Sequence, residues 1–422
     1  MIMNRPLRVL HLSTSDIRGG AAKGSFALHQ ALRRAGVDSQ MLVGRKHSDD
    51  PLVGELCRTA AVIERARGVL DTLPLRMYRK SDDSFWSVGW LSRRIDRVLA
   101  QQDPDVIHMH WTGGGFLPVK ALAGVRQPVV WTLRDMWAFT GGCHYTAGCD
   151  GYEAQCGRCP QLSSDNENDL SHRMWRHKFA AWRQFDVSVV AISSWLADCA
   201  RASGLFDHAT IDVIPNGIDT AVFRPYPRDQ ARAVLGLTPG RRHVVYGALG
   251  ALSDRRKGYL ELVQALQRIN AFTSDNDIVL SVFGNASPAE MPEMNIEVRD
   301  FGPIDDDRTL AMLYAAGDVM VVPSLQEAFG KTLVEAMACG TPVVAFNSGG
   351  PADIVVHRET GYLAEAFEPT DLARGIAWCV ETPGRIAQLG DAARKRTEVE
   401  YSIDHIGNLY RDMYQRLLET AA

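Results

Sequence analysis

The stretch that decides the fold covers residues 319–340 and reads VMVVPSLQEAFGKTLVEAMACG. The apolar run Val319–Val322 is typical of a buried strand, and Pro323 ends it. A helical pattern then begins at Gly330 and runs to about Cys339, where a further glycine follows. A buried strand followed by a loop and a helix is the repeating unit of a parallel sheet covered by helices.

Strand-like runs of this kind recur along the whole chain and alternate with helical patterns. The predicted strands cover residues 7–12, 39–43, 106–110, 129–133 and 187–192 in the first half, and 243–246, 278–283, 319–322 and 342–346 in the second. Because the alternation occurs twice, the sequence predicts an α/β protein with two doubly wound, Rossmann-like domains. Open sheets of this class bind ligands at the carboxyl ends of their strands, so we expect a ligand in a cleft between the domains.

The predicted domain boundary lies in residues 211–225, which contain two prolines, an Asn-Gly turn signal and little periodicity. We therefore assign residues 1–208 to an N-terminal domain and residues 209–402 to a C-terminal domain. Residues 403–422 show a final helical pattern with one apolar side, which we expect to pack back on the N-terminal domain.

Composition excludes several classes of protein. The 422 residues contain 46 Lys and Arg against 50 Asp and Glu, a formal net charge of −4, so we expect no nucleic-acid partner. No apolar run is long enough to cross a membrane, and the N-terminus lacks the pattern of a signal peptide. We therefore expect a cytoplasmic protein.

The chemistry of residues 319–340 points to a phosphorylated ligand. The N–H groups of Gly330, Lys331 and Thr332 lie at the start of the predicted helix, where its dipole favours an anion. Glu335, one turn further on, can accept hydrogen bonds from vicinal hydroxyls such as those of a ribose. Glu327, in the loop before the helix, faces whatever lies beyond the phosphates. This order predicts a nucleotide sugar as ligand.

The E-x₇-E spacing of Glu327 and Glu335 resembles the donor motif of the retaining glycosyltransferases of family 4. Three further stretches are similar to that family: PNGIDTAVF at residues 215–223, DRRKGYLELVQAL at 254–266 and TPVVAFNSGGPADIV at 341–355. The resemblance implies a GT-B fold. It also implies a C-terminal domain that binds a nucleotide sugar, an acceptor-side N-terminal domain, and retention of the anomeric configuration.

The resemblance implies a role for each donor-site residue. Glu335 holds the ribose hydroxyls, and Glu327 holds the donor sugar. Lys257, assisted by Arg256, neutralises the diphosphate and stabilises it as a leaving group. This arrangement needs no catalytic divalent metal, and we expect none.

In the N-terminal domain, the resemblance brings the loop Gly19-Gly20 to the diphosphate and the acceptor, where glycine permits close backbone approach. Arg134 and Asp135 follow the strand at 129–133. Many relatives have a histidine at the position of Arg134, where it contacts the donor sugar. A guanidinium cannot act as a base, but it can donate to a hydroxyl or a phosphate. Asp135 could orient Arg134 or face the acceptor. The inferred mechanism is a front-face displacement, in which the leaving diphosphate takes the proton of the acceptor hydroxyl.

Four cysteines lie in one glycine-rich loop at residues 140–162: Cys143, Cys149, Cys156 and Cys159. Four soft ligands, two of them with knuckle spacing, predict a structural zinc site. An iron–sulfur cluster uses the same ligands, and free or disulfide-bonded cysteines are further alternatives. His144 is an alternative ligand, but with four cysteines available we expect it to support them without binding the metal directly. The loop resembles the branch of the family that serves bacterial exopolysaccharide, colanic-acid-type assembly.

The resemblance to this branch implies transfer of a hexose to a glycan or a lipid-linked saccharide in cell-surface polysaccharide biosynthesis. Residues 63–80, IERARGVLDTLPLRMYRK, mix basic and apolar residues. They could lie on the anionic cytoplasmic face of the inner membrane, or form an amphipathic helix that covers the core. Two other functions remain alternatives: a nucleotide-sugar epimerase or hydrolase of the same fold, and a non-catalytic scaffold. The intact pair Glu327 and Glu335, with Lys257, favours the transferase.

Overall fold

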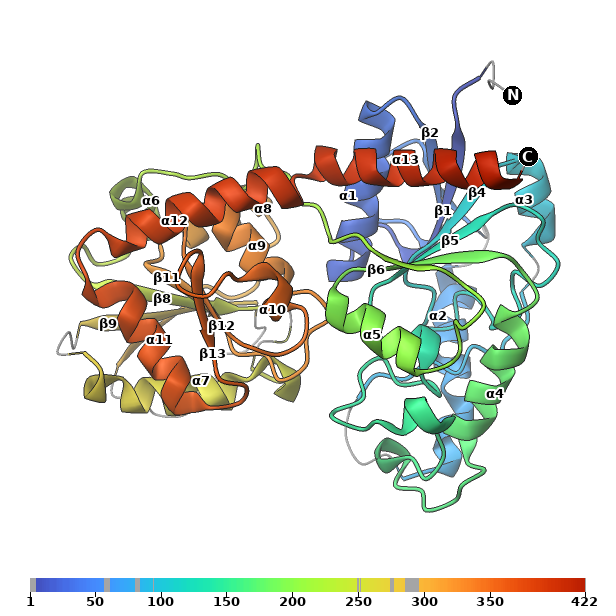
Figure 1. The fold of residues 1–422 in the computed structure, drawn as a ribbon, viewed down its shortest axis with the longest axis horizontal. Helices are drawn as coiled ribbons and strands as arrows, with labels where there is room; N and C mark the ends of the chain where they lie inside the picture. Colours follow the sequence, from blue (N-terminus) through green and yellow to red (C-terminus); the bar gives the residue numbers. More distant parts are fainter. Residues whose placement is uncertain are drawn as a thin grey trace. The chain divides into compact units, whose positions relative to one another are not determined.

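The computed structural model describes residues 5–56, 61–79, 84–93, 95–248, 250, 252–273, 277–284 and 296–421. The chain divides into two compact units, which are described separately (Figure 1). Unit 1 comprises Met1–Pro215 and Ile406–Ala422, and unit 2 comprises Asn216–His405. Each unit contains one parallel sheet with helices, so the predicted α/β class with two doubly wound sheets is confirmed.

Unit 1 contains a seven-stranded sheet in the order β3-β2-β1-β4-β5-β6-β7, and all neighbouring strands are parallel. Its strands are β1 Arg8–Ser15, β2 Asp38–Arg45, β3 Val53–Glu55, β4 Val106–Met109, β5 Val129–Leu133, β6 Val187–Ala191 and β7 Ile211–Val213. Its helices are α1 Gly20–Arg34, α2 Ala61–Asp71, α3 Asp96–Gln102, α4 Leu170–Trp182, α5 Ser194–Ala202 and most of α13 Ile403–Ala421. The prediction of a linker over 211–225 is wrong at its start, because β7 pairs with β6 there.

The last helix contributes to the core of unit 1. The buried side chains of α13 recur three and four residues apart, the spacing of one face of a helix. They are Ile406, Tyr410, Met413 and Tyr414, and they form one cluster with Leu28, Leu32, Val106, Val130 and Val190. The apolar pattern that predicts this helix is therefore the face that it buries against the sheet.

Unit 2 contains a six-stranded parallel sheet in the order β10-β9-β8-β11-β12-β13. Its strands are β8 Arg242–Gly247, β9 Ile278–Phe283, β10 Glu297–Asp300, β11 Val319–Val322, β12 Val343–Phe346 and β13 Gly361–Ala364. Its helices are α6 Arg228–Leu235, α7 Tyr259–Arg268, α8 Asp307–Ala316, α9 Lys331–Ala338, α10 Pro351–Ile354, α11 Pro369–Glu381 and α12 Arg385–Arg396. Figure 1 shows α7 and α11 on one face of this sheet and α8, α9 and α12 on the other. The strand order changes direction at β8, so β11 lies beside the topological switch point.

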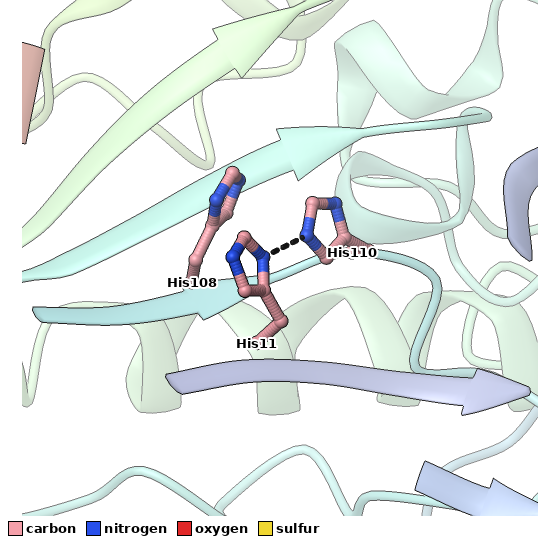
Figure 2. A group of neighbouring side chains, drawn as sticks. All are labelled: His11, His108 and His110. Carbon is pink, nitrogen blue, oxygen red and sulfur yellow. Dashed lines mark hydrogen bonds between the residues drawn. The ribbon is translucent and has the colours of Figure 1, made fainter. Parts of the chain in front are cut away.

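Three neighbouring histidines lie inside unit 1 (Figure 2). His11 is on β1, His108 is on β4, and His110 follows β4 directly. All three side chains are buried. Burial lowers the pKa of each histidine well below its ordinary value, and the positive charge of Arg134 lowers each pKa further. The three rings are therefore neutral at physiological pH.

The free energy of unfolding should fall as the pH drops below about 6.5, the ordinary histidine pKa. The unfolded chain takes up protons on these three histidines there, whereas the folded unit does not. Each histidine can contribute a slope of up to about 1.4 kcal/mol per pH unit, and none contributes well above that pH. Urea denaturation between pH 8 and about 5.5 measures the slope.

The test variant for this prediction is His11→Asn, and His405→Asn is its matched control. His11→Asn removes a buried ring that only the unfolded chain protonates and should lower the slope, whereas the exposed His405 lies outside the cluster and controls for the substitution itself. A pH-independent free energy of unfolding would contradict the neutral, buried assignment.

Candidate functional site

The candidate donor site lies where β11 ends and α9 begins, as the sequence predicts. Glu327 lies in the connecting loop, and Glu335 lies inside α9. Gly330 is the N-cap of α9 with a φ of 99°, a conformation that favours glycine. The first N–H groups of α9, at Lys331 and Thr332, point along the helix axis and form the positive end of its dipole.

Glu327 forms an ion pair with Lys257. The Lys257 Nζ lies 2.7 Å from the Glu327 Oε2, and their side chains are 18% and 14% exposed. Burial alone would raise the pKa of Glu327, but the charges of Lys257 and Arg256 outweigh it and hold the pKa below its ordinary value. The Phe329 N–H also donates to this carboxylate. Glu327 is therefore an ionised, fixed carboxylate.

Gly258 brings Lys257 to this position. Its φ is 71°, and a Cβ atom there would lie 1.7 Å from the carbonyl oxygen of Pro323. The Leu325 N–H donates to the Arg256 carbonyl at 2.7 Å, which joins the two loops. The turn that carries Arg256 and Lys257 thus packs directly on the loop that carries Glu327. The structure brings these predicted residues together from positions about 70 residues apart.

Glu335 is buried and already has two donors. The Tyr314 hydroxyl donates to Oε2 at 2.8 Å, and the Lys331 Nζ lies 2.5 Å from Oε1. A carboxylate offers about four lone-pair positions, so each oxygen can accept one further hydrogen bond. Sequence reasoning missed Tyr314, because the apolar pattern of α8 gives it no signal beyond burial. It also assigned Lys331 only a backbone role, whereas the side chain pairs with Glu335.

The glycines predicted in unit 1 lie at the start of α1. Gly19 is the N-cap of α1 with a φ of 89°, and Gly20 is its first residue. A Cβ atom at either position would meet no atom within 4 Å. The backbone of this turn is therefore open to the close approach that the sequence predicts.

Asp135 is fixed by three donors that the sequence analysis did not name. Its carboxylate accepts from the Trp111 Nε1 at 2.5 Å, the His144 Nδ1 at 2.6 Å and the Trp137 N–H at 2.9 Å. Burial would raise the pKa of Asp135, but His144 and these hydrogen bonds lower it below its ordinary value. The role of Asp135, which could orient Arg134 or face the acceptor, stays a prediction.

Arg134 follows β5 directly and is buried. Its Nη2 lies 3.2 Å from the His110 Nδ1. Tyr410 and Tyr414 of α13 are close enough to affect the pKa of the guanidinium, which burial lowers. Arg134 is thus held at the carboxyl edge of the sheet by the histidine cluster.

The cysteine loop is unusually rich in left-handed backbone. The non-glycine residues with positive φ are Ala147, Gln155, Cys156, Arg158 and Ser163. Backbone N–H groups reach three of the sulfur atoms: Gly151 reaches Cys149, Gly141 reaches Cys156, and Gln161 and Leu162 reach Cys159. All four thiols are free, and no three of the four sulfur atoms lie within 4.8 Å of one another. Both ring nitrogens of His144, the alternative ligand, already have hydrogen-bond partners: Nδ1 contacts Asp135, and Nε2 contacts Ser87.

Among the described residues, the nitrogens of His11, His108 and His110 do lie within 4.8 Å of one another. Their hydrogen bonds nevertheless do not fit a metal site. Both nitrogens of His108 have partners, Tyr414 at 2.6 Å and Thr132 at 2.7 Å. The nearby Arg134 guanidinium would also repel a cation. We therefore describe the cluster as a hydrogen-bonded network.

The fold and the donor-site geometry define a two-domain glycosyltransferase of the GT-B type, and comparisons with known proteins agree. Residues 232–396 match the family model described as glycosyl transferases group 1, and residues 18–222 match glycosyltransferase family 4. The D-inositol 3-phosphate glycosyltransferase of Pseudarthrobacter chlorophenolicus is 33% identical over 94% of this chain and 92% of its own. That of Arthrobacter sp. strain FB24 is 28% identical over 91% of this chain and 88% of its own. The chain therefore belongs to the glycosyltransferases that these two family models describe.

Solved structures share the fold. Sucrose-phosphate synthase from Thermosynechococcus elongatus superposes with a TM-score of 0.70 at 21% identity, covering 98% of this chain and all of its own. HepE from Anabaena, solved with UDP-glucose, superposes with a TM-score of 0.67 at 19% identity, covering 97% of this chain and 99% of its own. In the part of this chain that the structure describes, no helix is long and apolar enough to cross a membrane.

Gly258→Ala should destabilise the protein by about 3 kcal/mol or more, because the new methyl group overlaps the backbone of Pro323. Gly236→Ala is the matched control, since Gly236 also has positive φ, at 65°, but a Cβ atom there meets nothing within 4 Å. Its cost should be about 1–2 kcal/mol. Urea denaturation measures both variants, and equal losses would show that the approach to Pro323 is not the constraint.

Proposed function

We propose that this enzyme is a retaining hexosyltransferase. It takes a hexose from a nucleoside diphosphate sugar and transfers it to a glycan or lipid-linked saccharide in bacterial exopolysaccharide biosynthesis. The observation that carries the proposal is the partly buried Lys257–Glu327 pair beside the start of α9, with Glu335 one turn inside the helix. The structural similarity to HepE, which was solved with UDP-glucose, supports a nucleotide sugar as donor.

Each group in the site matches one part of the donor. The remaining lone pairs of Glu335 accept the two ribose hydroxyls. The N–H groups of Gly330, Lys331 and Thr332 bind the diphosphate, together with Lys257 and Arg256. Glu327 then faces the sugar.

The mechanism proposed is a front-face displacement that keeps the anomeric configuration. Negative charge grows on the leaving diphosphate, where Lys257 and the α9 dipole stabilise it without reorganisation. The fixed negative charge of Glu327 stabilises the positive charge that develops on the sugar ring. Arg134 donates hydrogen bonds to the substrate, and the diphosphate oxygen accepts the acceptor proton. No protein nucleophile is needed.

The surface of unit 1 supports a lipid-linked acceptor. Large apolar side chains with substantial exposure gather in one segment: Val69 at 60%, Leu70 at 42%, Met77 at 85%, Phe85 at 53% and Trp90 at 47%. The Trp90 Nε1 donates to the Leu70 carbonyl at 3.3 Å, so distant parts of the segment lie together. Apolar side chains beside the basic Arg76 suit peripheral contact with an anionic membrane face.

The cysteine loop is proposed to bind a structural zinc ion, with an iron–sulfur cluster as the alternative metal group. Backbone N–H groups aimed at sulfur are the usual environment of metal-bound thiolates. The buried Lys178 supports this proposal. Its Nζ donates to the Trp137 and Thr140 carbonyls, and burial lowers its pKa to about 7, whereas the nearby Cys143 and Cys156 favour its charged form. A negatively charged metal–thiolate group would give this ammonium group a counter-charge.

The purified protein should contain close to one zinc ion per chain. The variant Cys156→Ser should contain less zinc. In this variant the free energy of unfolding should fall more than the affinity for the donor. The cysteine loop belongs to unit 1, whereas Lys257, Glu327 and Glu335 belong to unit 2. Cys199→Ser is the matched control, since Cys199 is a buried cysteine of unit 1 outside the loop. Elemental analysis of anaerobically prepared protein measures the metal, and metal-free, folded protein would contradict the proposal.

The two glutamates should separate nucleotide binding from transfer. Glu335→Ala should weaken binding of the bare nucleoside diphosphate by about 1.5–3 kcal/mol, because a charged hydrogen-bond partner of the ribose is lost. Glu327→Ala should leave that affinity nearly unchanged, since no sugar is present, but should lower the transfer rate by about two decades or more. Calorimetry and product analysis measure the two effects. The opposite pattern would reverse the roles, and no effect in either folded variant would remove the site.

A thermal-shift panel with UDP, GDP and ADP, each bare and as sugar conjugates, identifies the donor, because a ligand of the native state raises its melting temperature. With that donor, a saccharide-dependent product separates a transferase from an epimerase or hydrolase. A protein that binds none of these nucleotides would be a scaffold.

A further inference from the structure

A chain of buried hydrogen bonds runs from Arg134 through His110 to His11. The Arg134 Nη2 lies 3.2 Å from the His110 Nδ1, and the His110 Nε2 lies 2.8 Å from the His11 Nδ1. Figure 2 shows the second of these bonds, with a nitrogen of each ring pointing toward the other ring. Their planes differ by 11°.

The strands fix the spacing of this chain. His11 lies on β1, His110 follows β4, and Arg134 follows β5, and these three strands are consecutive neighbours in the sheet. In the register, His11 pairs with His108 across β1 and β4, and Met109, just before His110, pairs with Trp131 across β4 and β5. Arg134 therefore meets His110 because the carboxyl ends of adjacent parallel strands meet at one edge.

The chemistry of arginine determines the proton positions in the chain. A guanidinium group can only donate, so the His110 Nδ1 must carry a lone pair. A neutral ring then carries its hydrogen on Nε2, and this N–H donates to the His11 Nδ1. His11 must in turn carry its hydrogen on its own Nε2. The burial-lowered pKa of both rings agrees with neutral imidazoles.

We propose that His110 and His11 are positioning residues, which hold the Arg134 guanidinium in the orientation that glycosyl transfer requires. This inference rests on the proposed role of Arg134 as a donor to the substrate. A buried arginine side chain has several rotamers, and the acceptor on His110 selects one of them. His11 then accepts the hydrogen on the second nitrogen of His110 and holds the ring in its orientation, as a partner on the second nitrogen does for a catalytic or metal-bound histidine.

His108 lies outside this chain, although it is the third member of the cluster. Its two nitrogens contact the Tyr414 hydroxyl of α13 and the Thr132 hydroxyl of β5, and Thr132 also contacts Tyr410 at 2.8 Å. These contacts join the last helix to the sheet. His108 therefore belongs to the packing of α13, whereas His110 and His11 face Arg134.

The tautomers provide a test that does not depend on activity. Long-range proton–nitrogen NMR of the full chain labelled with ¹⁵N-histidine should show neutral His11 and His110 at pH 7.5, each with its hydrogen on Nε2. Single substitutions assign the signals. A hydrogen on the His110 Nδ1 or a cationic ring would overturn the inference.

Two variants of His110 separate the contacts by geometry. Asparagine places its oxygen near the former Nδ1 and keeps an acceptor for Arg134, whereas glutamine reaches the position of Nε2 and loses that acceptor. His110→Gln should lower kcat by about tenfold to a hundredfold with little change in the donor KM, as misplacement of a positioned group does. His110→Asn should retain most of kcat. His29→Asn is the matched control, because His29 is a buried histidine bonded to Ser39 outside the chain.

Arg134→Gln distinguishes the two levels of the proposal. If this variant transfers at the wild-type rate, the role of Arg134 fails, whatever the histidine variants do. If Arg134→Gln is slow while His110→Gln is as fast as His110→Asn, the positioning inference fails and the role of Arg134 stands.

Discussion

The ion pair between Lys257 and Glu327 is the interaction on which the donor site depends. A partly buried ion pair adds little net stability, because desolvation offsets the attraction, yet removing one partner leaves the other charge without compensation. The pair is held by backbone that permits no side chain at Gly258 against the carbonyl of Pro323. Such a constraint is better explained by the chemistry of the site than by stability. It keeps an ammonium group and a carboxylate at fixed positions next to the start of α9.

The other charged side chains of the donor site are also held in ion pairs. Lys331 pairs with Glu335, and Arg256 pairs with Asp254, so the formal charges of the site cancel before any donor binds. A diphosphate then meets the Lys257 and Arg256 cations, which their carboxylate partners already hold in place, and the oriented N–H groups of α9. These groups need no reorganisation as charge develops. Because each of these charges has an oppositely charged partner, the side chains remain ionised although they are largely shielded from water.

The sequence predicts the fold well, because alternating apolar runs and helical patterns reflect local physics. It misses β3, β10 and β13, and it reads β7 as linker, because all four are short strands at the edges of their sheets. The exposure of β10 and β7 leaves them no continuous apolar run.

The candidate site was only partly predictable. The glutamate spacing and the glycine at the start of α9 are visible within one stretch of chain. The contacts of Glu335 with Tyr314, and of Asp135 with Trp111 and His144, join separate elements and leave no local pattern. The pairing of His110 with Arg134 likewise depends on the order of strands in the sheet, which sequence periodicity does not specify.

The most direct test of the account is the anomeric configuration of the first product. Proton NMR can follow a nucleotide sugar that the enzyme binds, and can read the coupling of the anomeric proton in the transferred sugar as nucleoside diphosphate is released. The account predicts the configuration of the donor, together with release of one nucleoside diphosphate per transfer. An inverted product, or turnover without release of nucleoside diphosphate, would contradict a front-face reaction at the Lys257–Glu327 site.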